Sequence, residues 1–213
     1  FLQFIMNKSK SLLEGIGNYK DTNIYYNKWS SSYEKTLLKW QYAAPQKVVL
    51  KLKNNTSIVP NKILDLGCGT GLFGKEIKKI YPDSIIDGLD ISKKIIDVAK
   101  EKKIYRNLIC ANFDRILNFK KNYDLVSCIG AMTYTKNPKK LILNVFKILN
   151  FNGCFVFTHR TDLFEKEGYS VLLNKLSNKF KIKNISRPLL YLPKNKDFGH
   201  KVKIRVILLK KNN

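Results

Sequence analysis

The chain has 213 residues, of which 44% are hydrophobic, and this composition excludes general disorder and supplies the core of one domain of ordinary size. Forty basic against 16 acidic residues give a formal net charge of +24, which suggests a polyanionic partner such as nucleic acid. Only five of the forty are arginine, the side chain best suited to phosphate and base edges. Because the lysines run through every segment, we interpret the charge as compositional bias and do not favour nucleic-acid binding.

No apolar run approaches the roughly 18–20 residues that a membrane span needs, and the opening Phe-Leu-Gln-Phe-Ile-Met is too short for the apolar region of a signal peptide. None of the four cysteines forms a C-x-x-C pair, and each falls in or beside an expected buried strand: Cys68, Cys110, Cys128 and Cys154. This favours reduced packing thiols over disulfides or a metal site. We therefore expect a cytoplasmic protein that needs no metal.

The first expected elements are helices. Tyr26, Trp29 and Tyr33 follow one another at i, i+3 and i+7 and share one helical face. A second helix, about 41–53, ends before a break near Pro60. The aromatic face has two interpretations: it packs on the rest of the domain, or it forms a lid over a cationic ligand, because aromatic rings attract cations by roughly 0.5–2 kcal/mol each.

The most informative stretch follows, and it reads Leu64-Asp65-Leu66-Gly67-Cys68-Gly69-Thr70-Gly71. An apolar run ends at an acid, passes through three alternate glycines and opens into a helical pattern. Glycine tolerates positive φ and carries no Cβ to keep a ligand off the backbone. The following helix, about 72–81, presents free N–H groups to the turn. The sequence therefore predicts a nucleotide-binding strand–turn–helix.

Two kinds of nucleotide fit this stretch. Residues 69–74 satisfy the G-x-G-x-x-G spacing of dinucleotide sites, which is a weak pattern by itself. The acid two residues before the first of three alternate glycines, however, resembles motif I of the class I S-adenosylmethionine-dependent methyltransferases. The resemblance implies S-adenosylmethionine as the cofactor and contacts from Asp65, Gly67, Gly69 and Gly71. An NAD(P)-linked oxidoreductase stays the alternative.

The next strand, about 84–90, ends at an acid. Asp90 lies about 20 residues past the glycine turn, where a carboxylate accepts hydrogen bonds from a ribose diol. Ser92 is the better cap for the following helix, and Asp87, three residues earlier on the strand, is expected to point elsewhere. Asp90 and the adjoining Ile91 are therefore predicted to bind the cofactor.

Two further strands end in predicted site residues. Strand 107–111 leads to Asn112 and Phe113, and the resemblance implies that residue 112, usually Asp, reaches the adenine amino group. Asn112 keeps an acceptor oxygen without the charge; the alternative is an ordinary turn residue. The stretch 121–132 resembles the fourth motif of the family, which places Ser127 beside the methionine part of the cofactor and the substrate.

The aromatic helix also has a counterpart. Residues 23–34 resemble a Tyr- and Trp-containing segment ahead of motif I in the Williams–Beuren-region type of methyltransferase-like proteins, which implies cofactor contacts from Tyr26 and Trp29. Both acids of that segment differ here, as Asn27 and Glu34. The resemblance predicts an N-terminal helical lid segment over residues 1–58 and an S-adenosylmethionine-binding methyltransferase domain over 59–213, together one compact domain.

The last third of the chain completes the pattern with a helix over 138–149, a strand over 154–158, a long helix over 163–180 and strands over 181–190 and 201–209. His159 follows a strand on the expected substrate side. An imidazole titrates near neutrality and is the weak candidate for a catalytic base, although a structural role is favoured. No other catalytic residue is predicted.

Alternating strands and helices over residues 60–160 predict an α/β fold. The resemblance specifies a Rossmann-like class I methyltransferase fold with a mainly parallel seven-stranded sheet, an antiparallel C-terminal strand and helices on both faces. The predicted function is S-adenosylmethionine-dependent methyl transfer to a small molecule. Two alternatives stay open: an NAD(P)-linked oxidoreductase, and a non-catalytic cofactor-binding module associated with RNA.

Overall fold

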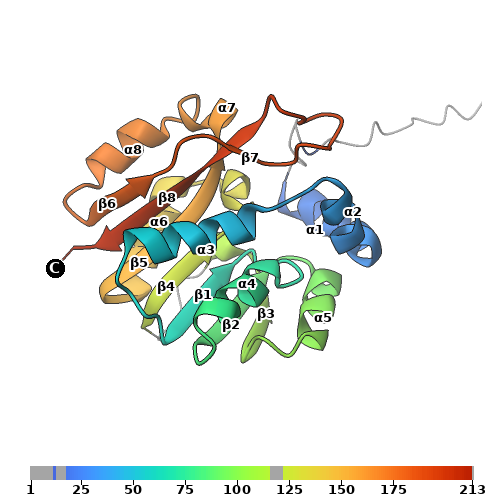
Figure 1. Ribbon diagram of the computed structural model, residues 1–213, viewed down its shortest axis with the longest axis horizontal. Helices are drawn as coiled ribbons and strands as arrows, with labels where there is room; N and C mark the ends of the chain where they lie inside the picture. Colours follow the sequence, from blue (N-terminus) through green and yellow to red (C-terminus); the bar gives the residue numbers. More distant parts are fainter. Residues whose placement is uncertain (1–11, 13–17, 116–121, 213) are drawn as a thin grey trace, which may run out of the picture.

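The computed structural model describes residues 12, 18–115 and 122–212. Its centre is one sheet (Figure 1), in the order β3 (Asn107–Cys110), β2 (Ile85–Asp90), β1 (Lys62–Leu66), β4 (Tyr123–Cys128), β5 (Leu149–Arg160), β8 (Lys203–Lys211) and β6 (Phe180–Ile185). The first five strands are parallel, whereas β8 pairs antiparallel with both β5 and β6. The predicted fold class is thus confirmed, and β7 (Leu189–Leu190) adds a short pairing to β8.

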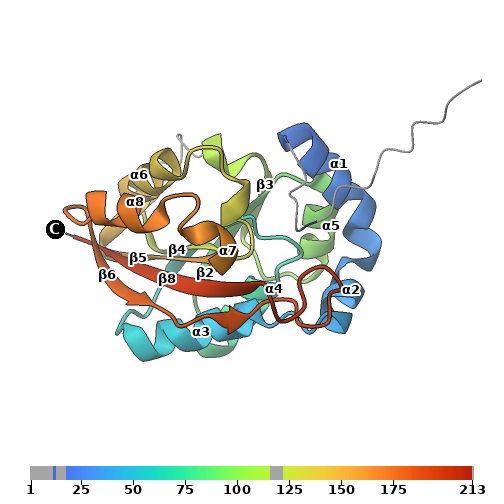
Figure 2. The same cartoon turned by 90° about the horizontal axis from the view of Figure 1, so that it is seen from above.

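Helices cover both faces of the sheet (Figure 2). One face carries α3 (Ala44–Asn55) and α4 (Leu72–Ile80), and the other carries α6 (Pro138–Ile148) and α8 (Tyr169–Lys175). Successive strand residues point to opposite faces, so on β4 Leu125 packs with Val48 of α3 while Val126 packs with Val145 of α6. Because both faces are covered, the central strands are largely buried and rich in apolar residues.

Three expected elements have different bounds in the structure. The long helix over 163–180 is two helices, α7 (Thr161–Phe164) and α8, because Gly168 before α8 adopts a left-handed φ of 70°. The strand over 181–190 is interrupted at Pro188, which has no N–H to donate, and this separates β6 from β7. The helix expected from residue 41 begins at Ala44, because Gln41 has a φ of 57°.

The N-terminal helices lie beyond the end of the sheet at which β1, β2 and β4 finish (Figure 1). They are α1 (Tyr19–Trp29), the 3-10 turn η1 (Ser30–Ser32) and α2 (Tyr33–Lys39). The expected aromatic face is preserved across that turn, with the ring centroids of Trp29 and Tyr33 4.7 Å apart and those of Tyr26 and Trp29 5.9 Å apart. Within residues 1–58, α3 packs on the sheet instead.

Cysteine burial differs from expectation at one position. Cys68, Cys128 and Cys154 are buried, but Cys110 is exposed on β3, the strand at the sheet edge. All four cysteines are free thiols.

Glycines near the β1–α4 turn make room for the ring of Tyr105. A Cβ atom would lie 2.9 Å from that side chain at Gly71, 2.7 Å at Gly74 and 2.9 Å at Gly88. Those distances are too short for a Cβ, so the three glycines form a slot for the ring. Within the slot the Tyr105 hydroxyl donates to Asp65 Oδ2 at 2.8 Å. The glycine spacing that resembles a dinucleotide site therefore serves packing at two of its positions, Gly71 and Gly74.

The Tyr105 slot predicts strong coupling between Gly74 and Tyr105. Gly74→Ala forces the ring to move, while the same change in a Tyr105→Leu background meets no ring and gains helix propensity. We expect Gly74→Ala to cost at least about 1 kcal/mol more in wild type than in Tyr105→Leu. Urea unfolding of the four proteins measures this, and equal costs in the two backgrounds would contradict the slot.

Candidate active site

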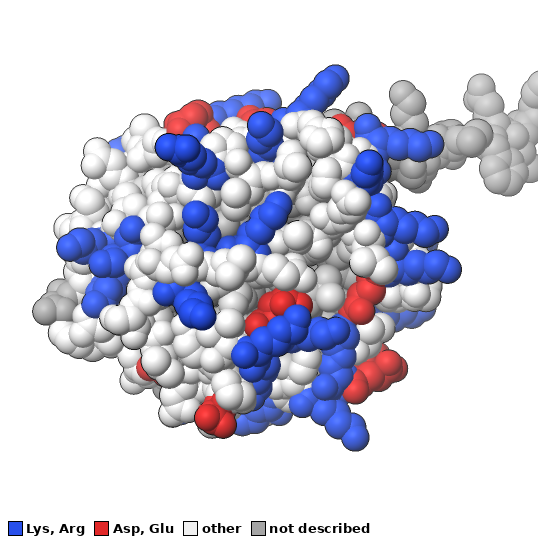
Figure 3. Space-filling view, in the orientation of Figure 1, with Lys and Arg blue, Asp and Glu red and all other residues white. Residues whose placement is uncertain are grey.

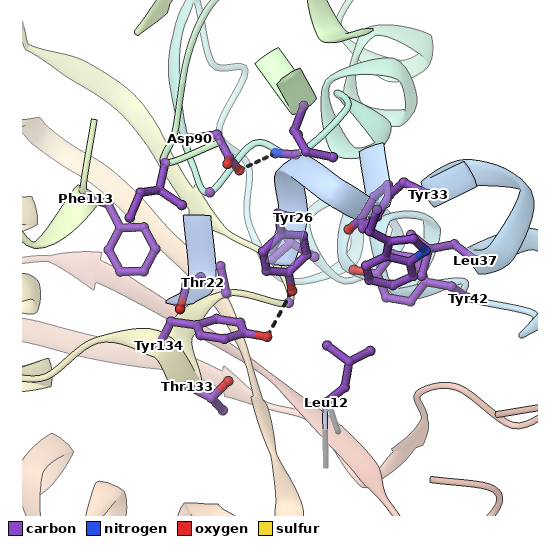
Figure 4. Close-up of a pocket in the computed structure, with 18 of the residues that line it drawn as sticks. Leu12, Thr22, Tyr26, Tyr33, Leu37, Tyr42, Asp90, Phe113, Thr133 and Tyr134 are labelled. Carbon is purple, nitrogen blue, oxygen red and sulfur yellow. Dashed lines mark hydrogen bonds between the residues drawn. The ribbon is translucent and has the colours of Figure 1, made fainter. Parts of the chain in front are cut away.

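A pocket opens between the N-terminal helices and the ends of the parallel strands (Figure 4). It encloses about 1020 Å³, part of which is open to solvent. A smaller pocket of about 320 Å³ adjoins it. The two share five lining residues, which include two of the three glycines of the turn: Tyr33, Tyr42, Gly67, Gly69 and Ile129. The glycine turn therefore lies at the junction of the two spaces.

Asp90 lines the larger pocket at the end of β2. Its Oδ2 accepts from the Gly69 N–H at 2.9 Å (Figure 4), and its Oδ1 accepts from the Ser92 N–H at 2.9 Å. Burial raises the pKa of this carboxyl. A carboxylate has about four acceptor positions, so Asp90 can still accept hydrogen bonds from a ligand. Ser92 caps α5 (Lys93–Glu101), as expected, and Asp87 points away to pair with Arg106.

The turn glycines have different surroundings. Gly67 and Gly69 have φ of 66° and 55° and line both pockets. A Cβ at Gly67 would lie 2.6 Å from the Ala131 Cβ, whereas at Gly69 the nearest atom would be the Tyr33 hydroxyl at 3.8 Å. A side chain at Gly69 would therefore project into the space that a ligand needs. Gly71, also predicted to bind the cofactor, faces Tyr105 and lines neither pocket.

Asp65 lies beneath the turn in a closed hydrogen-bond network. Its Oδ1 accepts from Ser127 Oγ and its Oδ2 from the Tyr105 hydroxyl, both at 2.8 Å. Burial raises the pKa of Asp65 to about 7, even though these two hydrogen bonds act in the opposite direction. Asp65 lines the smaller pocket. Ser127 was expected beside the ligand, but it is fully buried and lines neither pocket, because its hydroxyl is turned to Asp65.

Ile91, Asn112 and Phe113 line the same larger pocket as Asp90. The Asn112 oxygen accepts from the Asp114 N–H at 2.9 Å, which fixes the amide at the turn after β3. Tyr26 and Trp29 line the pocket from α1, and the Tyr26 and Tyr134 hydroxyls are hydrogen-bonded at 2.9 Å (Figure 4). The structure thus brings these residues from three separate regions of the sequence to one cavity.

Several side-chain hydrogen bonds hold the N-terminal helices over the pocket, and those of Asn27 and Glu34 are among them. Asn27 Oδ1 accepts from Ser92 Oγ at 2.8 Å and from the Lys94 N–H at 3.1 Å. Lys102 Nζ bonds both the Glu34 carboxylate and the Thr70 carbonyl oxygen of the glycine turn. Asn27 and Glu34 are the positions at which the sequence departs from the resembled segment. Here they attach the helices to the segments that carry Asp90 and Gly69.

His159 is not where the sequence suggested. Its side chain is fully buried, its Nε2 lies 3.1 Å from Glu167 Oε2, and its ring centroid is 4.1 Å from that of Tyr169. Burial lowers the pKa of this imidazole. The expectation that it faces the substrate is wrong, because the ring packs into the core on the α8 side. The adjoining Arg160 lines the pocket instead.

Several lining residues were not predicted. They are aromatic and come from distant parts of the chain: Tyr19, Tyr42, Tyr134, Tyr191 and Phe198. Tyr42 and Tyr191 lie in connecting segments without helical or strand periodicity, so no spacing in the sequence pairs them. Only the fold, through the pairing of β7 with β8, brings the second of them to the pocket.

A sequence profile for the family described as "Methyltransferase domain" matches residues 60–194. The chain belongs to this methyltransferase-domain family. A malonyl-acyl-carrier-protein O-methyltransferase of Legionella pneumophila is 32% identical over 104 residues, which are 47% of this chain and 37% of that protein. A ubiquinone biosynthesis O-methyltransferase of Coxiella burnetii is 25% identical over 114 residues, 52% of this chain and 48% of that protein. The chain thus spans about half or less of the length of these relatives.

Solved structures of other proteins have the same fold. The plantazolicin methyltransferase BpumL, in complex with S-adenosylhomocysteine (SAH), aligns with a TM-score of 0.62 and 18% identity over 89% of this chain and 90% of its own. The [4+2]-cyclase SpnF aligns with a TM-score of 0.70 and 12% identity over 92% of this chain and 97% of its own. At these identities the likeness establishes the architecture, and SpnF shows that the architecture also occurs in a protein named for another reaction.

On the face drawn in Figure 3, Lys and Arg side chains are spread over most of the surface rather than gathered at one place. Among the helices of the described residues, none is long and apolar enough to cross a membrane. Within the same residues, no group of three or more His, Cys, Asp or Glu side chains is arranged to hold a metal ion.

The Asp65 network predicts a specific pH dependence of stability. The folded protein holds the Asp65 proton more tightly than the unfolded chain, so the contribution of Asp65 falls as pH rises from about 4 to about 7 and is constant above that. A shift of this size amounts to roughly 4 kcal/mol. Asp65→Asn removes this slope while keeping an acceptor oxygen.

The measurement is the free energy of unfolding from pH 4 to 8 for wild type, Asp65→Asn and the exposed control Asp83→Asn. Subtracting the curves isolates Asp65 from the other carboxyls. A difference between wild type and Asp65→Asn that does not change with pH would contradict the raised pKa.

Proposed function

We propose that this protein is an S-adenosylmethionine-dependent methyltransferase that acts on a small molecule. The observation that carries the proposal is the junction of Asp90 and Gly69: a partly buried carboxylate with acceptor capacity adjoins a backbone turn on which a side chain would project into the pocket. Membership of the methyltransferase-domain family supports the reaction. The O-methyltransferase names of the relatives favour an oxygen acceptor, on a free or carrier-linked molecule.

The lining residues fit each part of this cofactor. Asp90 would accept from the ribose hydroxyls, and the backbone of Gly67 and Gly69 would allow close approach. Ile91, Asn112 and Phe113 would hold the adenine by packing and by the amide of Asn112. Tyr26 and Trp29 would cover the cofactor from the lid helices, where aromatic faces attract a sulfonium. Asp65 and Ser127 would support the turn from below rather than touch the nucleoside.

The cofactor, when bound, supplies an activated methyl group, and the protein supplies orientation. Holding an acceptor in line with the methyl group would contribute roughly 7–11 kcal/mol to lowering the barrier. That contribution needs no acid or base of the chain, which agrees with the burial of His159 away from the pocket. The lid helices would exclude water from the reacting groups.

The direct test incubates the protein with S-adenosylmethionine labelled in the methyl group and a cell extract, and then separates small molecules from macromolecules. We expect label in a small molecule or a carrier-linked acyl group, and none with heat-inactivated protein. Calorimetric titration with SAH and with NADP⁺ tests the cofactor independently. Tighter binding of NADP⁺, or no transfer of label to any fraction, would contradict the proposal.

Asp90 is predicted to dominate cofactor affinity. Each hydrogen bond from a ribose hydroxyl to the carboxylate contributes about 1.5–3 kcal/mol, so Asp90→Ala should weaken SAH binding by at least about tenfold. Asp90→Asn keeps one acceptor oxygen and should weaken it less. The matched control Asp97→Asn, an exposed carboxyl of α5, should leave the dissociation constant unchanged. Unaltered binding by Asp90→Ala would exclude the assigned role.

A further inference from the structure

The pocket continues past the glycine turn to a part lined by tyrosine hydroxyls. A Cβ atom at Gly130 would lie 3.0 Å from the Tyr42 hydroxyl and 3.3 Å from the Tyr191 hydroxyl. Both hydroxyls therefore point at the same turn, which follows β4. The two rings meet edge to face, with centroids 5.7 Å apart. Residues from the loop before α3, the turn after β4 and the loop after β7 thus converge on one point of the pocket wall.

These two hydroxyls have unused hydrogen-bonding capacity. Three other tyrosine hydroxyls of the pocket are engaged, since Tyr26 pairs with Tyr134 and Tyr19 donates to Asp114. Neither the Tyr42 nor the Tyr191 hydroxyl has a hydrogen-bond partner among the described residues. Burial raises the pKa of both phenols, so they stay protonated at neutral pH and act as donors rather than bases. A ligand oxygen at this point would satisfy them.

The surroundings of this part are apolar and nearly neutral. Arg160 is the nearby charged lining residue, and its Nε and Nη2 bind the two carboxylate oxygens of Asp162 at 3.1 and 2.6 Å. Its guanidinium also lies over the Phe198 ring, 5.1 Å from the centroid. The Arg160 charge is therefore compensated, and the remaining wall of Ile129, Leu192 and aromatic rings suits a flat, uncharged molecule.

This part lies on the side of the pocket at which the proposed cofactor would present its methyl group. Phe113 and Tyr42 lie on opposite sides of Tyr26 (Figure 4). In S-adenosylmethionine the sulfonium is attached to the ribose at the end away from the adenine. With adenine at Asn112 and Phe113 and ribose at Asp90, the methyl group would be directed past Gly69 toward Gly130.

We propose that the Tyr42 and Tyr191 hydroxyls bind an oxygen atom of the methyl acceptor, and that the acceptor is a flat, uncharged molecule carrying a hydroxyl or carbonyl group. This inference rests on the proposed function, because it uses the position assigned to the cofactor. Tyr42 and Tyr191 are positioning residues for the acceptor and are not part of the cofactor site.

The test measures binding of 2-naphthol and of its oxygen-free analogue naphthalene to the full chain saturated with SAH, by equilibrium dialysis. The variants are Tyr42→Phe, Tyr191→Phe and the double variant, which keep the rings. Tyr81→Phe is the control, because this hydroxyl lies outside both pockets. Each single change should weaken 2-naphthol binding about two- to tenfold and leave naphthalene and SAH binding unchanged.

Three results would overturn the inference while the proposed function stands. They are no binding of 2-naphthol by the SAH-bound wild type, equal weakening of 2-naphthol and naphthalene, and weakening of SAH itself by Tyr42→Phe or Tyr191→Phe. The last result would mean that the hydroxyls face the cofactor. Failure of the wild-type chain to bind SAH at all would instead refute the proposed function, and the inference with it.

Discussion

The hydrogen bond from the Gly69 N–H to Asp90 joins the turn after β1 to the end of β2, and the shape of the pocket depends on it. The carboxylate fixes the backbone of a glycine-rich turn, while the turn and Ser92 together hold the carboxylate at the pocket wall. Beneath this pair, Asp65, Ser127 and Tyr105 form a second set of hydrogen bonds that supports the turn from the sheet. The ligand-facing surface is thus positioned by polar contacts in two layers.

Packing explains why the turn can be so sharply defined. Tyr105 occupies the slot left by Gly71, Gly74 and Gly88, and its hydroxyl donates a hydrogen bond to the Asp65 carboxylate. One residue therefore links helix α4, strand β2 and the buried carboxylate. The glycines therefore serve two purposes that the sequence pattern does not distinguish. Gly67 and Gly69 form the turn at the pocket, whereas Gly71, Gly74 and Gly88 leave space for the Tyr105 ring.

The fold was predictable because its signals are local and repeated: apolar strands alternate with amphipathic helices, and Asp90 ends its strand. Where the prediction for a site residue was wrong, the cause was side-chain packing in the folded structure, which the sequence pattern does not show. His159 lies near the end of β5 but its ring packs with Tyr169, and Ser127 turns to Asp65. Tyr42 and Tyr191 reach the pocket only because two segments about 150 residues apart in the sequence meet in the fold, and no periodic pattern in the sequence predicts such a contact. Asn27 departs from the resembled segment, yet it attaches α1 to the start of α5.

The attachments of the N-terminal helices have a kinetic consequence. Since α1 and α2 cover part of the cavity and are attached by Asn27 and Lys102 to the segments that carry Asp90 and Gly69, loosening of these helices would widen the entrance to the pocket. Each of these hydrogen bonds contributes only about 0.5–1.5 kcal/mol net, and such a local opening leaves the sheet intact, so it costs less than global unfolding. The helices that shape the wall of the pocket would then also control how fast a ligand enters and leaves it.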